Sequence, residues 1–109
     1  MSDTIFSKIV NKEIPAEIVL ENEHCLAFKD INPVAEHHYL VITKKPFISL
    51  AELDAEHAAA MVLTLQELAK NLDIKDFRTV FNTGAKAGQT VFHVHAHFIA
   101  GRELGWPPG

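Results

Sequence analysis

The stretch Phe92-His93-Val94-His95-Ala96-His97-Phe98-Ile99 decides the fold, because histidines and apolar residues alternate along it without a break. Successive side chains of a β-strand point to opposite faces of its sheet, so the alternation predicts a half-buried strand within residues 90–99. The three histidines then line one face, which is an unusual choice for a surface that merely faces water. The other face carries the apolar residues that we expect in the core, namely Phe92, Val94, Ala96 and Phe98.

A glycine-rich loop, Thr83-Gly84-Ala85-Lys86-Ala87-Gly88-Gln89, precedes this strand. Gly84 and Gly88 permit backbone conformations that other residues avoid, and successive amide N–H groups in such a loop can form an anion-binding nest. Gln89 and Thr90 add side-chain donors beside the first histidine. The loop therefore predicts a phosphate site next to the imidazoles.

Helices and further strands can be placed from their own patterns. A short helix begins after Asp3 or Thr4 and runs to about Asn11. A long helix begins after Asp54 and ends near Asn71, and its apolar residues recur three and four positions apart, so one side of it is buried. Four more strands are expected, at residues 17–20, 25–29, 38–43 and 77–82.

These elements predict an α+β domain, an antiparallel five-stranded sheet with one long and one short helix packed to one side. The 109 residues form a single domain, residues 1–109, with residues 101–109 as a C-terminal tail that its prolines keep from being regular helix or central strand. Because so small a domain buries little surface by itself, we expect a homodimer in which the sheet continues across the two copies.

The composition excludes several classes of protein. Ten Lys and Arg against fourteen Asp and Glu give a formal charge of −4, and the basic stripe of a nucleic-acid-binding domain is missing. No apolar run approaches the roughly 20 residues that a membrane-spanning helix needs. The start, Met1-Ser2-Asp3-Thr4, shows no secretory signal, and the single cysteine, Cys25, reads as a small buried thiol in a reducing compartment. We therefore expect a cytoplasmic protein with no nucleic-acid or membrane partner.

The row of histidines allows three chemical interpretations. The imidazoles could be solvated or hydrogen-bonded surface groups without a function. A His-x-His pair could bind zinc, with the distant His38 as a third ligand. However, His93 and His97 would lie about 13 Å apart at roughly 3.3 Å per residue, and no cysteine or nearby carboxylate completes the set. We therefore expect no metal and no other cofactor.

Covalent catalysis is the interpretation that we favour. A neutral imidazole is a competent nucleophile near pH 7, because its reference pKa is about 6.5. Neighbouring histidines can hold its tautomer and supply a proton to a leaving group. Closely spaced imidazoles also resist simultaneous protonation, so at least one of them stays neutral.

The alternation at His93–Ile99 resembles the signature of the histidine-triad family, and stretches along nearly the whole chain are similar to one branch of that family, the Hint branch. The C-terminal ending Trp106-Pro107-Pro108-Gly109 argues against the family's dinucleoside polyphosphate hydrolases, which lack this ending. The similar stretches are Asp3-Thr4-Ile5-Phe6, Lys12-Glu13-Ile14-Pro15-Ala16, Cys25-Leu26-Ala27-Phe28, Asp30-Ile31, His38-Tyr39-Leu40-Val41-Ile42 and Trp106-Pro107-Pro108-Gly109.

The resemblance implies a homodimeric hydrolase that cleaves the P–N bond of purine nucleoside 5′-phosphoramidates. By the family pattern, His95 attacks the α-phosphorus and forms a nucleotidyl-histidine intermediate, which water then hydrolyses. His97 lies beside the phosphate, and His93 and His38 orient the cluster and relay protons to the leaving amine.

The family's nucleotide contacts also fall on particular positions of this chain. The ribose-binding acid corresponds to Asp30. The phosphate-side residues correspond to Asn82, Gly88, Gln89 and Thr90. The purine pocket corresponds to Ile5, Phe6, Ile9, Phe28 and Ile31.

Two other functions stay open beside this one. The nucleotide site could serve a regulatory or scaffold module whose hydrolysis is incidental, or the chain could hydrolyse dinucleoside polyphosphates. An apolar pocket accepts adenine and guanine alike, and the leaving amine has no signature in the chain.

Overall fold

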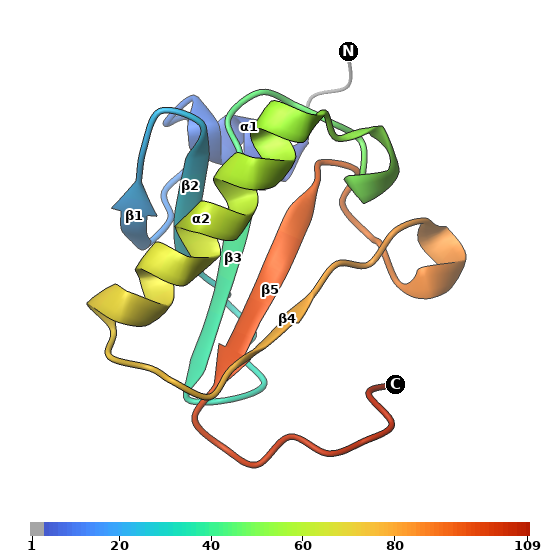
Figure 1. Cartoon of the computed structure of the whole chain (residues 1–109). Helices are drawn as coiled ribbons and strands as arrows, with labels where there is room; N and C mark the ends of the chain where they lie inside the picture. The colour runs from blue at the N-terminus through green and yellow to red at the C-terminus, as the bar shows by residue number, and fades with distance from the viewer. Residues whose placement is uncertain (1–3) are drawn as a thin grey trace.

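The computed structural model describes residues 4–109, whose five strands form one antiparallel sheet in the order β1-β2-β3-β5-β4 (Figure 1). This confirms the α+β class, with a five-stranded antiparallel sheet, one long helix and one short helix. The helices are α1 (Ile5–Val10) and α2 (Ala55–Asn71), and the 3-10 turns are η1 (Leu50–Glu52) and η2 (Ala85–Ala87). The strands are β1 (Ile18–Glu21), β2 (Cys25–Lys29), β3 (His37–Thr43), β4 (Arg78–Val80) and β5 (His95–Ala100).

The register of the central strands decides which side chains share a face. In the pairing of β3 with β5, Leu40 lies opposite His97 and Ile42 lies opposite His95. Directly opposed residues of antiparallel strands point to the same face, so both histidines stand on the Leu40 face. His38 lies opposite Ile99 and joins the same face.

The two helices cover opposite faces of the sheet, so the expectation that they pack to one side is wrong. Helix α2 lies across the near face in Figure 1 and buries Met61 and Leu68 against Val41 and Phe98 of the sheet. Helix α1 covers the other face, where Phe6 and Ile9 belong to a separate apolar cluster with four sheet residues, Leu26, Phe28, Leu40 and Ile42. The physical reason is that β3 is buried on both faces along nearly its whole length, so each face needs a cover.

Both helices begin at the kind of cap that their sequences predict. The side chain of Asp54 accepts a hydrogen bond from the His57 N–H at the start of α2, which ends at Asn71. Thr4 caps α1 and forms a reciprocal capping box with Ser7. The alternative cap, Asp3, lies outside the described residues.

The last strand is shorter than its alternation predicts. Strand β5 begins at His95, because the chain before it bends and the Val94 N–H donates to the carbonyl of Phe47 at 2.7 Å. Phe92, expected in the core, is 44% exposed, whereas Val94 packs in the core beneath α2 with Phe98. Strand β4 likewise covers only Arg78–Val80 of the predicted residues 77–82.

The single thiol of the chain lies in the core between α2 and the sheet. Cys25 is fully buried, and burial raises the pKa of its thiol. A protonated and inaccessible thiol is chemically inert, as the sequence indicates. Within residues 4–109, none of the helices has the length and apolar character required to cross a bilayer.

Candidate active site

Four histidines from three segments gather on the face of the sheet that α1 covers. His95 and His97 stand on β5 with ring centroids 5.3 Å apart, and His38 of β3 lies 5.2 Å from His97. His93 precedes β5 rather than belonging to it, but its ring still meets Phe6 of α1 edge to face at 6.1 Å. The ring of His95 meets Phe6 at 5.0 Å. The structure therefore places all four predicted histidines in one cluster.

The imidazole of His95 has one nitrogen held and one free for chemistry. Its Nδ1 lies 2.9 Å from the main-chain carbonyl of His93. A carbonyl can only accept, so Nδ1 carries the proton and Nε2 of the neutral ring keeps its lone pair. Burial lowers the pKa of His95, which keeps the ring neutral near pH 7. These are the two conditions for a nucleophilic imidazole.

His38 and His97 form a hydrogen-bonded chain whose proton positions follow from one amide. The Val34 N–H donates to Nδ1 of His38 at 3.1 Å, so the proton of the neutral His38 ring is on Nε2. That Nε2 lies 2.9 Å from Nδ1 of His97, which must accept. His97 then carries its own proton on Nε2. Burial first, and then neighbouring His95 and His38, lower the pKa of His97 to about 4, so it too is neutral.

Asp30 joins the cluster from the end of β2. Its Oδ2 lies 3.4 Å from Nε2 of His38, and its Oδ1 accepts a hydrogen bond from the Asn32 N–H at 2.7 Å. Its main-chain N–H also donates to the carbonyl of His38 at 3.0 Å. The carboxylate is thus held beside the histidines and at the edge of the neighbouring cavity.

Within residues 4–109, one group of side chains could hold a metal ion, and it differs from the set that the sequence suggested. Asp30, His38 and His97 offer ligand atoms within 4.8 Å of one another, whereas the sequence suggested a His-x-His pair with His38. Two nitrogens on one tetrahedral zinc lie about 3.3 Å apart, given bonds of roughly 2.0–2.1 Å. The separation of 2.9 Å between the His38 and His97 nitrogens is instead that of a shared hydrogen. The geometry favours a hydrogen-bonded pair.

His93 anchors the cluster from inside the protein. Its side chain is 1% exposed and its Nε2 donates to the carbonyl of Thr43 at 2.6 Å. Its Nδ1 has no hydrogen-bond partner among residues 4–109, and burial lowers its pKa. The expectation that His93 relays protons does not fit this position. Its contribution is to hold the chain so that its own carbonyl meets His95.

A cavity of about 340 Å³ opens beside the histidines, beneath α1. The side of α1 lines it together with residues 14–17, the end of β2 and Leu40 in the middle of β3, and Asp30 stands at its margin. The structure brings together all six residues that the family pattern assigns to the purine and the ribose, namely Ile5, Phe6, Ile9, Phe28, Asp30 and Ile31. Ile31 is 90% exposed, so it forms part of the rim.

The glycine-rich loop is braced internally and does not form the open nest expected of it. Gly84 and Gly88 have φ of +92° and +97°, as their roles as glycines predict. The main-chain N–H groups of Ala87 and Gln89 donate to the carbonyl of Gly84, and that of Gly88 donates to Ala85. These amides are therefore already satisfied within the loop.

The four residues assigned to the phosphate side lie in or near this loop. The Gln89 side chain accepts from the Gly84 N–H at 2.8 Å and donates to the carbonyls of Ile48 and Val91 at 2.7 and 3.2 Å, so it braces the loop. The Asn82 side chain packs beside Gly88, 3.8 Å from where a Cβ would stand. Thr90 is exposed. Within residues 4–109, no hydrogen bond joins these four residues to the histidines.

Two groups that position the histidines could not be found from the sequence. They are the N–H of Val34 and the carbonyl of Thr43, which bind His38 and His93. Every residue but proline carries both main-chain groups, so the identity of the residue gives no signal.

Comparison with known proteins agrees with this arrangement. The model of the HIT domain matches residues 11–104. An uncharacterized HIT-like protein of Synechococcus elongatus is 50% identical over 111 residues, covering 98% of this chain and 97% of that protein. Among solved structures, a HIT family hydrolase from Legionella pneumophila is 37% identical with a TM-score of 0.93, covering 98% of this chain and 100% of that one.

A third similar protein is a hypothetical histidine triad nucleotide-binding protein from Sulfolobus tokodaii. It is 35% identical with a TM-score of 0.79, and the match covers 94% of this chain and 71% of that one. The family model, the sequence relative and the solved structures thus agree over most of the chain, histidine strand included. The chain belongs to the HIT domain family and has the fold of its hydrolases.

Proposed function

We propose that this protein is a purine nucleoside phosphoramidase of the Hint branch, a hydrolase that cleaves the P–N bond of nucleoside 5′-phosphoramidates. The observation that carries the proposal is the state of His95. Its Nδ1 is held by the His93 carbonyl, its pKa is lowered by burial, and its Nε2 is left with a lone pair. A nucleophile prepared in this way suits attack on phosphorus.

The cavity beneath α1 supports a purine nucleoside as the part of the substrate that is recognised. Its walls come mainly from apolar side chains, with the Asp30 carboxylate at the margin where a ribose hydroxyl can donate to it. The Sulfolobus relative is described as nucleotide-binding. A volume of about 340 Å³ is within the usual range of small-molecule pockets.

The reaction proceeds in two displacements at the same phosphorus. Nε2 of His95 attacks the α-phosphorus, the P–N bond breaks, and the amine leaves with the bonding electron pair and a proton from water. A second water then attacks the phosphorus, the bond to Nε2 breaks, and a proton returns to solvent. The nucleoside monophosphate and the free His95 ring remain, so atoms and charges balance over the cycle.

His97 is the catalytic neighbour that faces the charge developing on phosphorus. Its Nε2–H donates to a phosphoryl oxygen, because its Nδ1 is occupied by His38. His38 and Asp30 hold this orientation. His97 stays neutral, so its Nδ1 keeps accepting from His38 across the physiological pH range.

We also propose a cytoplasmic homodimer. Strand β4 lies at one edge of the sheet, where its outer main-chain groups face no strand of this chain, and a second copy paired along it would continue the sheet. The single buried cysteine fits the reducing cytoplasm.

The decisive experiment measures AMP release from adenosine 5′-phosphoramidate, with and without a chelator, by the wild type and by His95→Ala. We expect turnover that a chelator does not change and that the variant lacks, while the variant still folds and binds AMP. Turnover by His95→Ala close to the wild-type rate would overturn the mechanism. Loss of turnover on chelation would make Asp30, His38 and His97 a metal site.

The same assay separates the other functions. Tight AMP binding by a wild type without turnover would indicate a regulatory or scaffold module. Faster release of AMP from a diadenosine polyphosphate than from the phosphoramidate would indicate a dinucleoside polyphosphate hydrolase.

A further inference from the structure

The loop between β2 and β3 lies between the histidine cluster and the C-terminal tail, and both main-chain groups of Val34 in this loop are used. Its N–H donates to Nδ1 of His38 at 3.1 Å. Its carbonyl accepts from Nε of Arg102, in the tail, at 2.9 Å. A single residue therefore joins the tail to a histidine of the site.

The tail is also fitted closely to this loop at the preceding residue. Gly101 has φ of +106°, and a Cβ built on it would lie 2.7 Å from Cβ of Glu36. No other residue can take this position without moving the loop. The contact of Arg102 with Val34 is therefore one part of a tight crossing of two segments.

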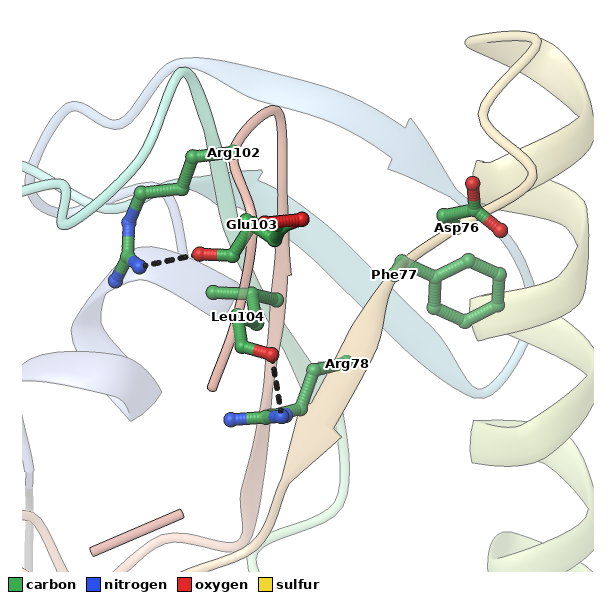
Figure 2. A pocket seen from close by; sticks show the side chains of 6 residues that line it. All are labelled: Asp76, Phe77, Arg78, Arg102, Glu103 and Leu104. Carbon is green, nitrogen blue, oxygen red and sulfur yellow. Dashed lines mark hydrogen bonds between the residues drawn. The ribbon is translucent and has the colours of Figure 1, made fainter. Parts of the chain in front are cut away.

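Two arginines fasten the tail, but only one of them reaches the loop. Figure 2 shows Arg102 and Arg78 on either side of Leu104, each bonded to a tail carbonyl. Nη2 of Arg78 donates to the carbonyls of Leu104 and Gly105 at 3.3 and 2.8 Å. Nη1 of Arg102 donates to the main-chain carbonyl of Glu103 at 3.1 Å. Its Nε donates to the carbonyl of Val34, a contact that Arg78 does not make.

We propose that Arg102 is a positioning residue for the hydrolytic reaction: by holding the carbonyl of Val34, it fixes the backbone of the residue whose N–H points at Nδ1 of His38. It thereby keeps the His38 proton on Nε2 and sets the tautomer of His97. This inference rests on the proposed function. Arg102 acts through the loop and touches neither the nucleophile nor the cavity.

The physical reason lies in the two tautomers of His38. When the Val34 N–H points at Nδ1, only Nε2 can carry the proton. When the Val34 carbonyl is released, the backbone at Val34 can rotate and turn its N–H away from Nδ1. His38 can then carry the proton on Nδ1 instead, and its Nε2 accepts from His97. The proton of His97 would move to Nδ1, and its Nε2 could no longer donate to a phosphoryl oxygen.

The groups that face His38 limit the size of the effect. Asp30 and His97 both offer acceptors to Nε2 of His38, at 3.4 and 2.9 Å, and His95 lies beyond His97. Asp30 also favours a proton on Nε2, so loss of Arg102 shifts the tautomer balance in part. The expected loss of kcat is about three- to tenfold, which corresponds to the free energy of one hydrogen bond to a main-chain carbonyl.

The test compares Arg102→Met with Arg78→Met in the full-length protein. Both variants lose a guanidinium that holds a tail carbonyl, but only the first loses the contact with Val34. We expect Arg102→Met to lower kcat for adenosine 5′-phosphoramidate about three- to tenfold with little change in KM. In ¹⁵N spectra of the histidine rings, the His38 signals should move toward the average of the two tautomers. Arg78→Met should leave both kcat and the His38 signals unchanged.

A second variant removes the amide directly. Val34→Pro lacks the N–H and should reproduce the shift of the His38 signals. Adding Arg102→Met to Val34→Pro should lower kcat no further, because both act on the same hydrogen bond. Unchanged His38 signals in Arg102→Met, equal losses of kcat in the two arginine variants, or fully additive losses with Val34→Pro would each overturn the inference. Because the spectra need no substrate, failure of the proposed function would be seen separately, as absence of turnover in the wild type.

Discussion

The two faces of the sheet use the same strands for opposite purposes. Beneath α2, apolar side chains such as Met61 and Phe98 form the larger of the two core clusters. Beneath α1, the smaller cluster around Phe6 stands beside the buried imidazoles of His93 and His95. Desolvation that stabilises the fold on the first face lowers the pKa values of the histidines on the second. Burial thus acts as packing on one face and as control of protonation on the other.

The largest effect is expected from a core residue beneath α2. Phe98 is fully buried and packs against Tyr39 and Phe77, with ring centroids 6.0 and 4.5 Å away. Phe98→Ala should lower the free energy of unfolding by about 3–5 kcal/mol, measured by urea denaturation, because it leaves a cavity. The kcat of the molecules that stay folded should change by less than about twofold.

Phe92→Ala is the matched control for this variant. It removes the same side chain six residues earlier, where the structure leaves it 44% exposed, and should cost less than about 1 kcal/mol. Similar losses of stability in the two variants would show that Phe92 is buried, as the alternation of the sequence had predicted.

A pH-dependent loss of stability should come from the other face. The pKa of His97 falls from its ordinary 6.5 to about 4 in the folded protein, chiefly through burial. Between these values the unfolded chain binds a proton that the folded protein does not, so stability is complete above pH 6.5 and is lost as the pH falls toward 4. The loss amounts to up to about 3 kcal/mol.

Urea denaturation of the wild type and of His97→Asn at several pH values between 4 and 7.5 checks this. The variant should lose stability less steeply on acidification, with the remaining slope coming from His93 and His95, whose pKa values are also lowered. Equal slopes in the two proteins would contradict the assignment to His97.

A smaller effect on substrate binding should follow from Asp30→Asn. The carboxylate lies 3.4 Å from Nε2 of His38 and lines the cavity, so its charge serves both the ribose and the histidine chain. We expect KM for adenosine 5′-phosphoramidate to rise about tenfold, which corresponds to one charged hydrogen bond. Asp54→Asn, at the cap of α2 on the opposite face, should leave KM unchanged; a similar rise there would remove the distinction between the faces.

The smallest effects on stability are expected from substitutions of the residues that cap the two helices. Thr4→Ala and Asp54→Ala each remove a side chain that accepts a hydrogen bond at a helix start, which costs about 1 kcal/mol of stability. Only α1 carries cavity residues, Phe6 and Ile9 among them, so only Thr4→Ala should also raise KM. Thermal unfolding and steady-state kinetics measure the two consequences, and a rise in KM for Asp54→Ala alone would contradict the comparison.

Periodicity predicted those parts of the fold that side-chain burial controls. Helix α2 and strand β2 stand where the pattern indicated, because apolar residues at regular spacing must face a core. The pattern failed where a main-chain contact overrides it. The Val94 N–H binds the carbonyl of Phe47 rather than a strand partner, so the alternation continues to Phe92 in the sequence but not in the sheet.

The candidate site likewise has features that could be predicted and features that main-chain contacts determine. The side chains of His38, His95 and His97 meet as the resemblance implies, whereas the contact of Asp30 with His38 is a finding of the structure. The roles of Gln89 and His93 differ from those expected, because their polar atoms bind main-chain carbonyls that no residue pattern reveals. The placement of the two helices on opposite faces was also missed, since the apolar stripe of α1 does not say which face of β3 it covers.

The burial of Cys25 has a practical consequence for the study of this protein. The chain has one thiol, and it lies fully covered between α2 and the sheet. A thiol reagent can reach it only when that layer opens, so the labelling rate reports how often the core beneath α2 becomes exposed under native conditions. Because the face beneath α1 contains no cysteine, the labelling rate of Cys25 measures the opening of the core beneath α2 and does not respond to motions of the other face.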